Sequence, residues 1–99
     1  MSTGLPRLSE EEITTRLAQL NNGWLRDGDK LVKEFEFRNF TEAAAFIGRI
    51  AGPADEMDHH PDVLLHRYRR VKIMLWTHSR GGLTQNDFDL AARIDAVAR

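Results

Sequence analysis

Residues 61–76 read PDVLLHRYRRVKIMLW, and this stretch decides the fold. Pro61 disfavours helical geometry at the residue before it, so the chain runs on in an extended path through residues 63–65. Farther along, the strongly apolar side chains recur at every second position, at Val71, Ile73 and Leu75. This period of two is typical of a half-buried strand. The stretch therefore predicts two strands that pair as an antiparallel hairpin.

A similar pattern lies upstream. Residues 24–26 and 31–37 are separated by Asp27-Gly28-Asp29-Lys30, and Asp-Gly between two apolar runs is a hairpin signal. In the second run Phe35 and Phe37 share one face with Leu31, whereas Glu34 and Glu36 share the other. We therefore expect a first hairpin with one buried face and one wet face.

Helix signals precede, separate and follow the hairpins. Ser9 with Glu12 forms a capping box, and Asn21-Asn22-Gly23 ends the helix that it starts. Thr41 is the expected N-cap of a second helix, and Thr84 that of a third. Apolar residues recur at helical spacing in both of these helices, in the second at Ala43, Ala44, Phe46, Ile47, Ile50 and Ala51, and in the third at Leu90, Ala91, Ile94, Val97 and Ala98.

Gly52-Pro53 interrupts the second helix. Proline in a helix interior lacks an N–H and collides with the carbonyl four residues earlier, which costs roughly 3 kcal/mol. We therefore expect a kink or a break before residues 54–57.

The predicted element order is α-β-β-α-β-β-α. Two hairpins give a four-stranded antiparallel sheet, and the helices are expected to pack on one of its faces, which is an α+β fold. No βαβ unit with a glycine-rich phosphate loop is evident, so a doubly wound parallel sheet is not expected. With 99 residues, we expect residues 1–99 to form a single domain.

Composition narrows the function classes. Fourteen Lys+Arg against fifteen Asp+Glu give a net charge of −1, so no bulk attraction to nucleic acid or anionic lipid is expected. The chain contains no cysteine, which removes disulfides, thiolate nucleophiles and cysteine-based zinc sites. Residues 1–7 lack the apolar run of a signal peptide, and no stretch approaches the ~20 apolar residues of a membrane span. We expect a cytoplasmic protein that does not bind membranes.

Three of the four histidines, His59, His60 and His78, lie within twenty residues. Free imidazole has a pKa of about 6.5, so such a cluster favours general acid/base chemistry. Adjacent side chains diverge on a helix or a strand, and the two neighbouring rings can share a pocket only if the backbone bends near Pro61. The residues by themselves fit equally well with a histidine pair that merely caps the second helix.

Asp55, His59-His60-Pro61, Tyr68, His78 and Asp87 occur in an order and at spacings that resemble the signature of the pterin-4a-carbinolamine dehydratases. Gly23-Trp24 and residues 77–84 are also similar to the family, so the resemblance spans nearly the whole chain. The family's α+β fold agrees with the predicted element order. Gly52-Pro53 departs from the pattern, because family members more often continue the second helix without proline, and that helix commonly contributes to subunit contacts.

This resemblance implies a 4a-hydroxytetrahydropterin substrate that loses water to give a quinonoid dihydropterin, without metal or cofactor. It implies that His59, His60 and His78 line a solvent-accessible pterin site as acid and base. Asp55 and Asp87 are candidates for orienting these rings, and Pro61 for bending the chain there, although Asp87 also fits a capping box with Thr84. Trp24 fits either an aromatic wall for the pterin or a core residue. Tyr68 is expected to pack on the second hairpin, and His66 to be a solvated strand residue.

Two other kinds of function compete. A zinc or iron site could use the same histidines with Asp55 or Asp58, but neighbouring histidines rarely bind one metal together. A catalytically silent interaction module is the second, because relatives serve as transcription-factor dimerisation cofactors or assembly factors that have lost the histidines. The basic residues at 67, 69, 70 and 72 fit a solvated face better than a DNA-binding surface. The broad apolar surface of the second helix and the open sheet edges predict a homodimer or homotetramer.

Overall fold

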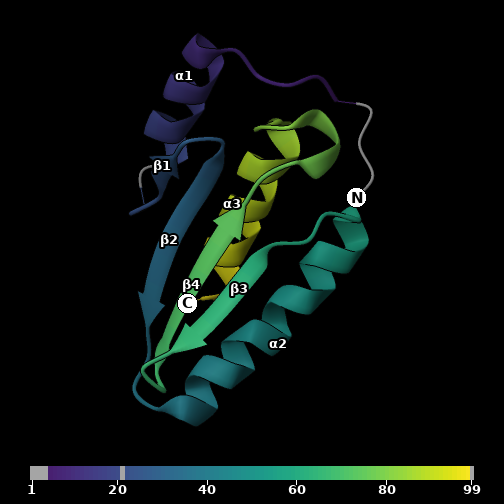
Figure 1. The fold of residues 1–99 in the computed structure, drawn as a ribbon. Helices are drawn as coiled ribbons and strands as arrows, with labels where there is room; N and C mark the ends of the chain where they lie inside the picture. Colours follow the sequence, from purple (N-terminus) through teal and green to yellow (C-terminus); the bar gives the residue numbers. More distant parts are fainter. Residues whose placement is uncertain (1–4, 21, 99) are drawn as a thin grey trace.

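The structure, a computed structural model, describes residues 5–20 and 22–98 of the chain. The elements follow the predicted order (Figure 1): α1 (Glu10–Leu20), β1 (Leu25–Asp27), β2 (Lys30–Glu36), α2 (Phe40–Met57), β3 (Asp62–His66), β4 (Arg70–Leu75), the short 3₁₀ turn η1 (His78–Arg80) and α3 (Gln85–Val97). The predicted α+β fold with a four-stranded antiparallel sheet is confirmed. Asn21, part of the predicted end of the first helix, lies outside the described residues.

The sheet has the strand order β1-β2-β4-β3, and every neighbouring pair is antiparallel. One face of the sheet is buried, because Val71, Ile73 and Leu75 of β4 and Leu31 of β2 have no exposure to solvent. The intervening residues of β4 are only partly buried. This alternation follows from the pleat of a strand, which sends successive side chains to opposite faces. The helices therefore cover one face and leave the other open.

The core lies between that buried face and the helices. α2 contributes Phe46 and Ile50, and α3 contributes Leu90 and Ile94. α2 packs against β3, β4 and α3, whereas α1 packs mainly against α3. Fully burying side chains of this size stabilises a fold by about 1.5–3 kcal/mol each, so the apolar faces of α2 and α3 hold the layers together.

Local capping fixes where the helices begin. Glu12 accepts a hydrogen bond from the Ser9 N–H (2.8 Å), and Ser9 Oγ accepts one from the Glu12 N–H (3.2 Å), which confirms the predicted capping box. These hydrogen bonds lower the pKa of the Glu12 carboxyl. The predicted cap of α2 at Thr41 is wrong, since Asn39 accepts the Glu42 N–H at 2.9 Å. An asparagine amide oxygen is a strong N-cap acceptor, and it moves the helix start upstream.

A kink or a break is predicted before residues 54–57, and the break is wrong. α2 continues through Pro53 to Met57. Its buried face extends across the proline, with Ile50 before it and Ala54 after it, both almost completely buried. Packing on both sides offsets the roughly 3 kcal/mol that an interior proline costs. The helix ends instead at Asp58, which adopts a left-handed conformation with φ of 49°.

The prediction that Tyr68 packs on the second hairpin is also wrong. Arg67 and Tyr68 both have positive φ, 50° and 56°, and form the tight turn between β3 and β4. Positive φ at two successive turn residues matches the right-handed twist of the flanking strands. The turn projects the Tyr68 ring outward, where it is 61% exposed. Among the described residues, no helix is long and apolar enough to cross a membrane.

Candidate active site

The signature residues centre on one fully buried contact. His59, just after α2, and Asp87, in the first turn of α3, are both completely buried, and His59 Nε2 lies 2.6 Å from Asp87 Oδ1. His59 Nδ1 has no hydrogen-bond partner among the described residues. When Nε2–H donates to the carboxylate, Nδ1 is left as a buried lone pair. The pair therefore joins the end of α2 to the start of α3.

Two threonines complete the surroundings of Asp87. Its second oxygen, Oδ2, accepts a hydrogen bond from the Thr77 hydroxyl at 2.8 Å and another from the Thr84 N–H at 2.9 Å. The hydroxyls of the two threonines lie 2.9 Å apart. Both roles considered for Asp87 therefore coexist, because one carboxylate caps α3 and holds His59. A buried carboxylate needs such a set of donors to offset its desolvation.

His60 faces the other way. Its side chain is 50% exposed, and its Nε2 lies 2.9 Å from Asp55 Oδ1, on a side chain that is 77% exposed. Asp55 lies in the last turn of α2, and Pro61 follows His60 and leads into β3. The chain reverses at Asp58, whose N–H bonds to the Asp55 carbonyl at 3.1 Å. Asp55 can thus orient the His60 ring from the helix that precedes it.

His78 begins η1, directly after Thr77, and is exposed. Its ring lies against the indole of Trp76, with the ring centroids 4.1 Å apart and the planes at 46°. Within residues 5–20 and 22–98 its side chain has no hydrogen bond and no ion pair. His78 is therefore the least restrained of the three imidazoles.

The end of the β3–β4 ladder shows how part of this group is brought together. The last pair of that ladder is Asp62 with Met74. Beyond it, His59 and Thr77 both contact Asp87. His60 directly follows His59 and His78 directly follows Thr77; both are exposed, and the His78 ring lies against Trp76. The end of α2 and the β4–α3 connection lie at the same end of the molecule (Figure 1).

The expectation that all three imidazoles are solvent-accessible is wrong for His59. Residues at successive positions of an extended chain point to opposite sides, so His59 is buried while His60 is exposed. The bend lies at Asp58, before the pair, and not between the two rings. In this structure two of the three imidazoles are exposed and the third is buried.

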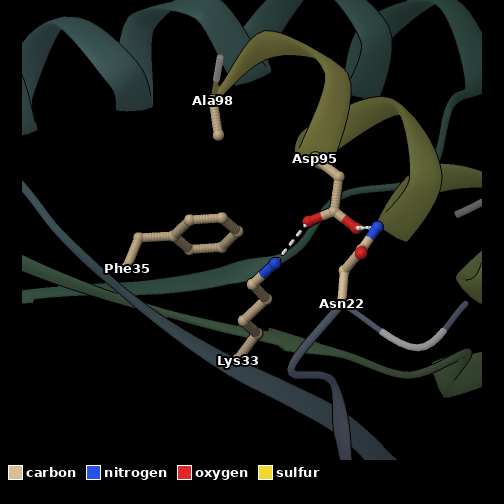
Figure 2. Close-up of a pocket in the computed structure, with 5 residues that line it drawn as sticks. All are labelled: Asn22, Lys33, Phe35, Asp95 and Ala98. Atoms are coloured by element: carbon tan, nitrogen blue, oxygen red, sulfur yellow. Dashed lines mark hydrogen bonds and ion pairs between the residues drawn. The ribbon is translucent and has the colours of Figure 1, made fainter.

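Trp24 is not brought to the histidines, and it is a core residue, 4% exposed. Its Nε1 donates to Asp95 Oδ2 at 3.0 Å, two turns of α3 or about 12 Å from Asp87. The same carboxylate accepts from Lys33 Nζ at 2.8 Å and from Asn22 Nδ2 at 3.3 Å (Figure 2). Asp95, Lys33 and Asn22 line a cavity of about 290 Å³ together with Phe35 and Ala98. The carboxylate is fully paired, so we interpret this cluster as structural.

His66 and the basic residues of the β3–β4 hairpin pair with acidic residues of the neighbouring strand β2. His66 Nε2 lies 2.8 Å from Glu34 Oε1, and the guanidinium of Arg69 pairs with Glu36 at 3.0 Å. Acidic residues of β2 thus face the basic residues of the β3–β4 hairpin. Within the described residues, no group of three or more His, Asp or Glu side chains is placed to hold a metal ion.

Comparison with known proteins assigns the chain to a family. The family model described as pterin 4 alpha carbinolamine dehydratase matches residues 6–97. The chain belongs to the pterin-4a-carbinolamine dehydratase family.

Relatives cover nearly the whole chain. A protein of Sulfolobus acidocaldarius, provisionally named a pterin-4-alpha-carbinolamine dehydratase, is 46% identical over 92% of this chain and 98% of its own length. A relative from Roseiflexus, provisionally named in the same way, is 46% identical over 92% and 96%.

Two solved structures share the fold. A transcriptional coactivator/pterin dehydratase from Brucella melitensis superposes with a TM-score of 0.87 at 34% identity, covering 94% of this chain and 99% of that one. A pterin dehydratase-like protein, described as a RuBisCO assembly factor in the alpha-carboxysome, gives 0.65 at 27% identity, covering 80% and 93%. The fold is therefore shared by proteins with different names and roles.

Sequence reasoning missed the roles of Thr77 and Trp76. Thr77 is completely buried and donates to Asp87, and Trp76 contacts His78. A threonine and a tryptophan at the end of a strand look like ordinary strand residues. The available signal was their position directly before His78. Successive side chains alternate between the two faces at the end of a strand, so one of these two residues could be expected on each face.

The two carboxylate–imidazole pairs are expected to differ in their contribution to stability. Asp87→Ala leaves His59, Thr77 and the Thr84 N–H without a buried acceptor, so it should lower the free energy of unfolding by about 3–5 kcal/mol. Asp55→Ala removes an exposed pair and should cost less than about 1 kcal/mol. Urea denaturation followed by circular dichroism measures both. Equal costs would contradict this assignment of Asp87.

Proposed function

We propose that this protein dehydrates a 4a-hydroxytetrahydropterin to the quinonoid dihydropterin, with imidazoles as the acid and the base. Membership of the family supports the substrate class. The observation that carries the chemistry is that His60 and His78, both exposed, directly follow His59 and Thr77, the two buried side chains that contact Asp87. The proposal includes the recycling of a tetrahydrobiopterin-type cofactor, because its product is a dihydropterin.

The protein has to supply only proton transfer. The bond between C4a and the hydroxyl oxygen breaks, and the hydroxyl leaves as water after receiving a proton. The proton on N5 is lost to a base, and a double bond forms between C4a and N5. The pterin supplies the electron pair that expels the hydroxyl, so no metal or redox cofactor enters the proposal. Each well-placed proton transfer contributes about 10²–10⁴-fold to the rate.

The three histidines take two kinds of role. His60 and His78 exchange protons with the substrate, because their side chains are exposed. Asp55 orients His60 through the 2.9 Å contact with Nε2. His59 is a positioning residue, since its ring is completely buried and anchors the chain at Asp87. Catalytic groups must be held within a narrow geometry, and a buried anchor supplies that rigidity.

A catalytically silent interaction module is the second candidate. The observation that favours it is the similarity to a structure described as an assembly factor and to one described as a coactivator. This chain retains all three histidines of the signature, which favours the enzyme. The activity assay below separates the two.

The purified protein should accelerate dehydration of freshly generated 4a-hydroxytetrahydropterin with no added metal, nucleotide or flavin. Stopped-flow absorbance measures the formation of the quinonoid product against the uncatalysed rate. Because only proton transfer is proposed, exhaustive chelation should leave the rate unchanged. Loss of activity on chelation with recovery on adding zinc would refute the imidazole mechanism, and absence of acceleration would favour the interaction module.

Replacing the histidines should separate the two kinds of role. His60→Ala and His78→Ala should each lower kcat/KM by an order of magnitude or more with little change in stability, since both rings are exposed. His59→Ala should lower both activity and the free energy of unfolding, because it leaves the buried Oδ1 of Asp87 without its partner. The losses should be non-additive, because neighbouring proton-transfer groups act as a unit.

His66→Ala is the matched control, because His66 lies on β3 beside Glu34 of β2 and outside the three signature histidines. It should retain activity close to that of the wild type. Near-wild-type activity in both His60→Ala and His78→Ala would refute the proposed roles.

We also propose that the chain forms a homodimer or homotetramer. The outward side of α2 presents exposed small residues, at Ala44, Ala45, Gly48, Ala51 and Gly52. The edge strand β3 exposes Val63 and Leu64, at 36% and 48%. Exposed small residues permit close helix contact, and an open edge strand offers unpaired backbone groups. Light scattering at tens of micromolar should give at least twice the 11.3 kDa chain mass, and a monomeric mass would contradict the proposal.

A further inference from the structure

His78 needs a support that the carboxylates do not provide. His59 and His60 each lie beside a carboxylate, at 2.6 and 2.9 Å. His78 is exposed on a turn of three residues, and its described contact is with the Trp76 ring. An unrestrained exposed side chain samples several rotamers, and fixing it costs free energy at the moment of reaction. A ring packed against it before the reaction lowers that cost.

Trp76 is itself held in place. It follows Leu75, which is completely buried and pairs with Leu31 of β2. The next step in that register puts Lys30 opposite Trp76, and Lys30 Nζ lies 5.4 Å from the centre of the indole ring. The indole therefore lies beside the Lys30 ammonium group and against the His78 ring.

The indole N–H adds an independent observation. Trp76 Nε1 is buried and has no hydrogen-bond partner among the described residues. An unpaired buried donor costs about 1–3 kcal/mol, which a phenylalanine at this position would avoid. A strained or unsatisfied group is most readily explained by a role other than stability.

We propose that Trp76 is a positioning residue that holds the His78 imidazole, through ring contact, in the orientation needed for proton transfer to or from the pterin. This inference rests on the proposed dehydratase function. Trp76 takes no proton itself. Its effect should therefore be on turnover more than on binding, and it should depend on the presence of His78.

The test compares Trp76→Leu, Trp76→Phe and wild type in two measurements. Trp76→Leu should lower kcat on the order of ten-fold, because a small displacement of a proton-transfer group has large effects on rate. The dissociation constant for 6-methyl-7,8-dihydropterin, a stable probe measured by calorimetry, should change less than about three-fold. Trp76→Phe keeps an aromatic ring and leaves no polar group unpaired, so it should stay folded and keep most of the turnover. Phe40→Leu, at an exposed aromatic residue of α2, is the matched control and should match wild type.

A double-mutant cycle tests whether Trp76 acts through His78. Trp76→Leu should cost no further turnover once His78 is replaced by alanine. An equal loss in both backgrounds would overturn the proposal, as would wild-type turnover in Trp76→Leu or a loss confined to probe affinity, which would make Trp76 a pterin-binding surface. Turnover in Trp76→Phe as low as in Trp76→Leu would also overturn it.

A measurement that needs no activity separates this inference from the proposed function. The indole ring current should shift the NMR signals of the His78 imidazole protons, and Trp76→Leu should remove that shift. Wild-type protein with the shift but without dehydratase activity would overturn the proposed function and, with it, the catalytic meaning of the contact. An active protein without the shift would overturn only the positioning role of Trp76.

Discussion

The organisation of this end of the molecule depends on one buried carboxylate. Asp87 has no exposure to solvent, and its two oxygens take hydrogen bonds from a histidine ring, a threonine hydroxyl and a backbone N–H. An unpaired carboxylate in such a place would cost several kcal/mol, so all three donors must be present together. They come from the end of α2, the end of β4 and the start of α3. Satisfying one charge therefore fixes three chain segments relative to one another.

This constraint explains why the signature histidines divide into two kinds. His59 is buried in its contact with Asp87, and extended geometry sends the next residue, His60, to the opposite side. Just after β4, Thr77 is directed to Asp87, whereas its neighbour Trp76 packs against the His78 ring. His60 and His78 are therefore exposed next to buried residues, His59 and Thr77, that contact Asp87. These buried contacts restrain the backbone that carries both exposed imidazoles.

A second buried carboxylate, Asp95, performs the corresponding task at the other end of α3. It binds Trp24, Lys33 and Asn22 and so ties the helix to β2 and to the segment before β1. Both ends of α3 are therefore fastened by charge-assisted hydrogen bonds, with apolar packing between them. The buried apolar face of α2 packs against the rest of the core on both sides of Pro53. This packing is why the interior proline does not end the helix.

The sequence by itself determined the order of elements, the antiparallel sheet and the family, because these depend on local periodicity, caps and residue spacing. The capping box at Ser9 and Glu12 and the core position considered for Trp24 are examples. Only the tertiary structure decided the rest. The burial of His59, the continuity of α2 through Pro53 and the contact of Trp76 with His78 depend on which surfaces meet across long sequence separations. Residue spacing predicts local elements, but it does not determine which side chains another part of the chain will bury.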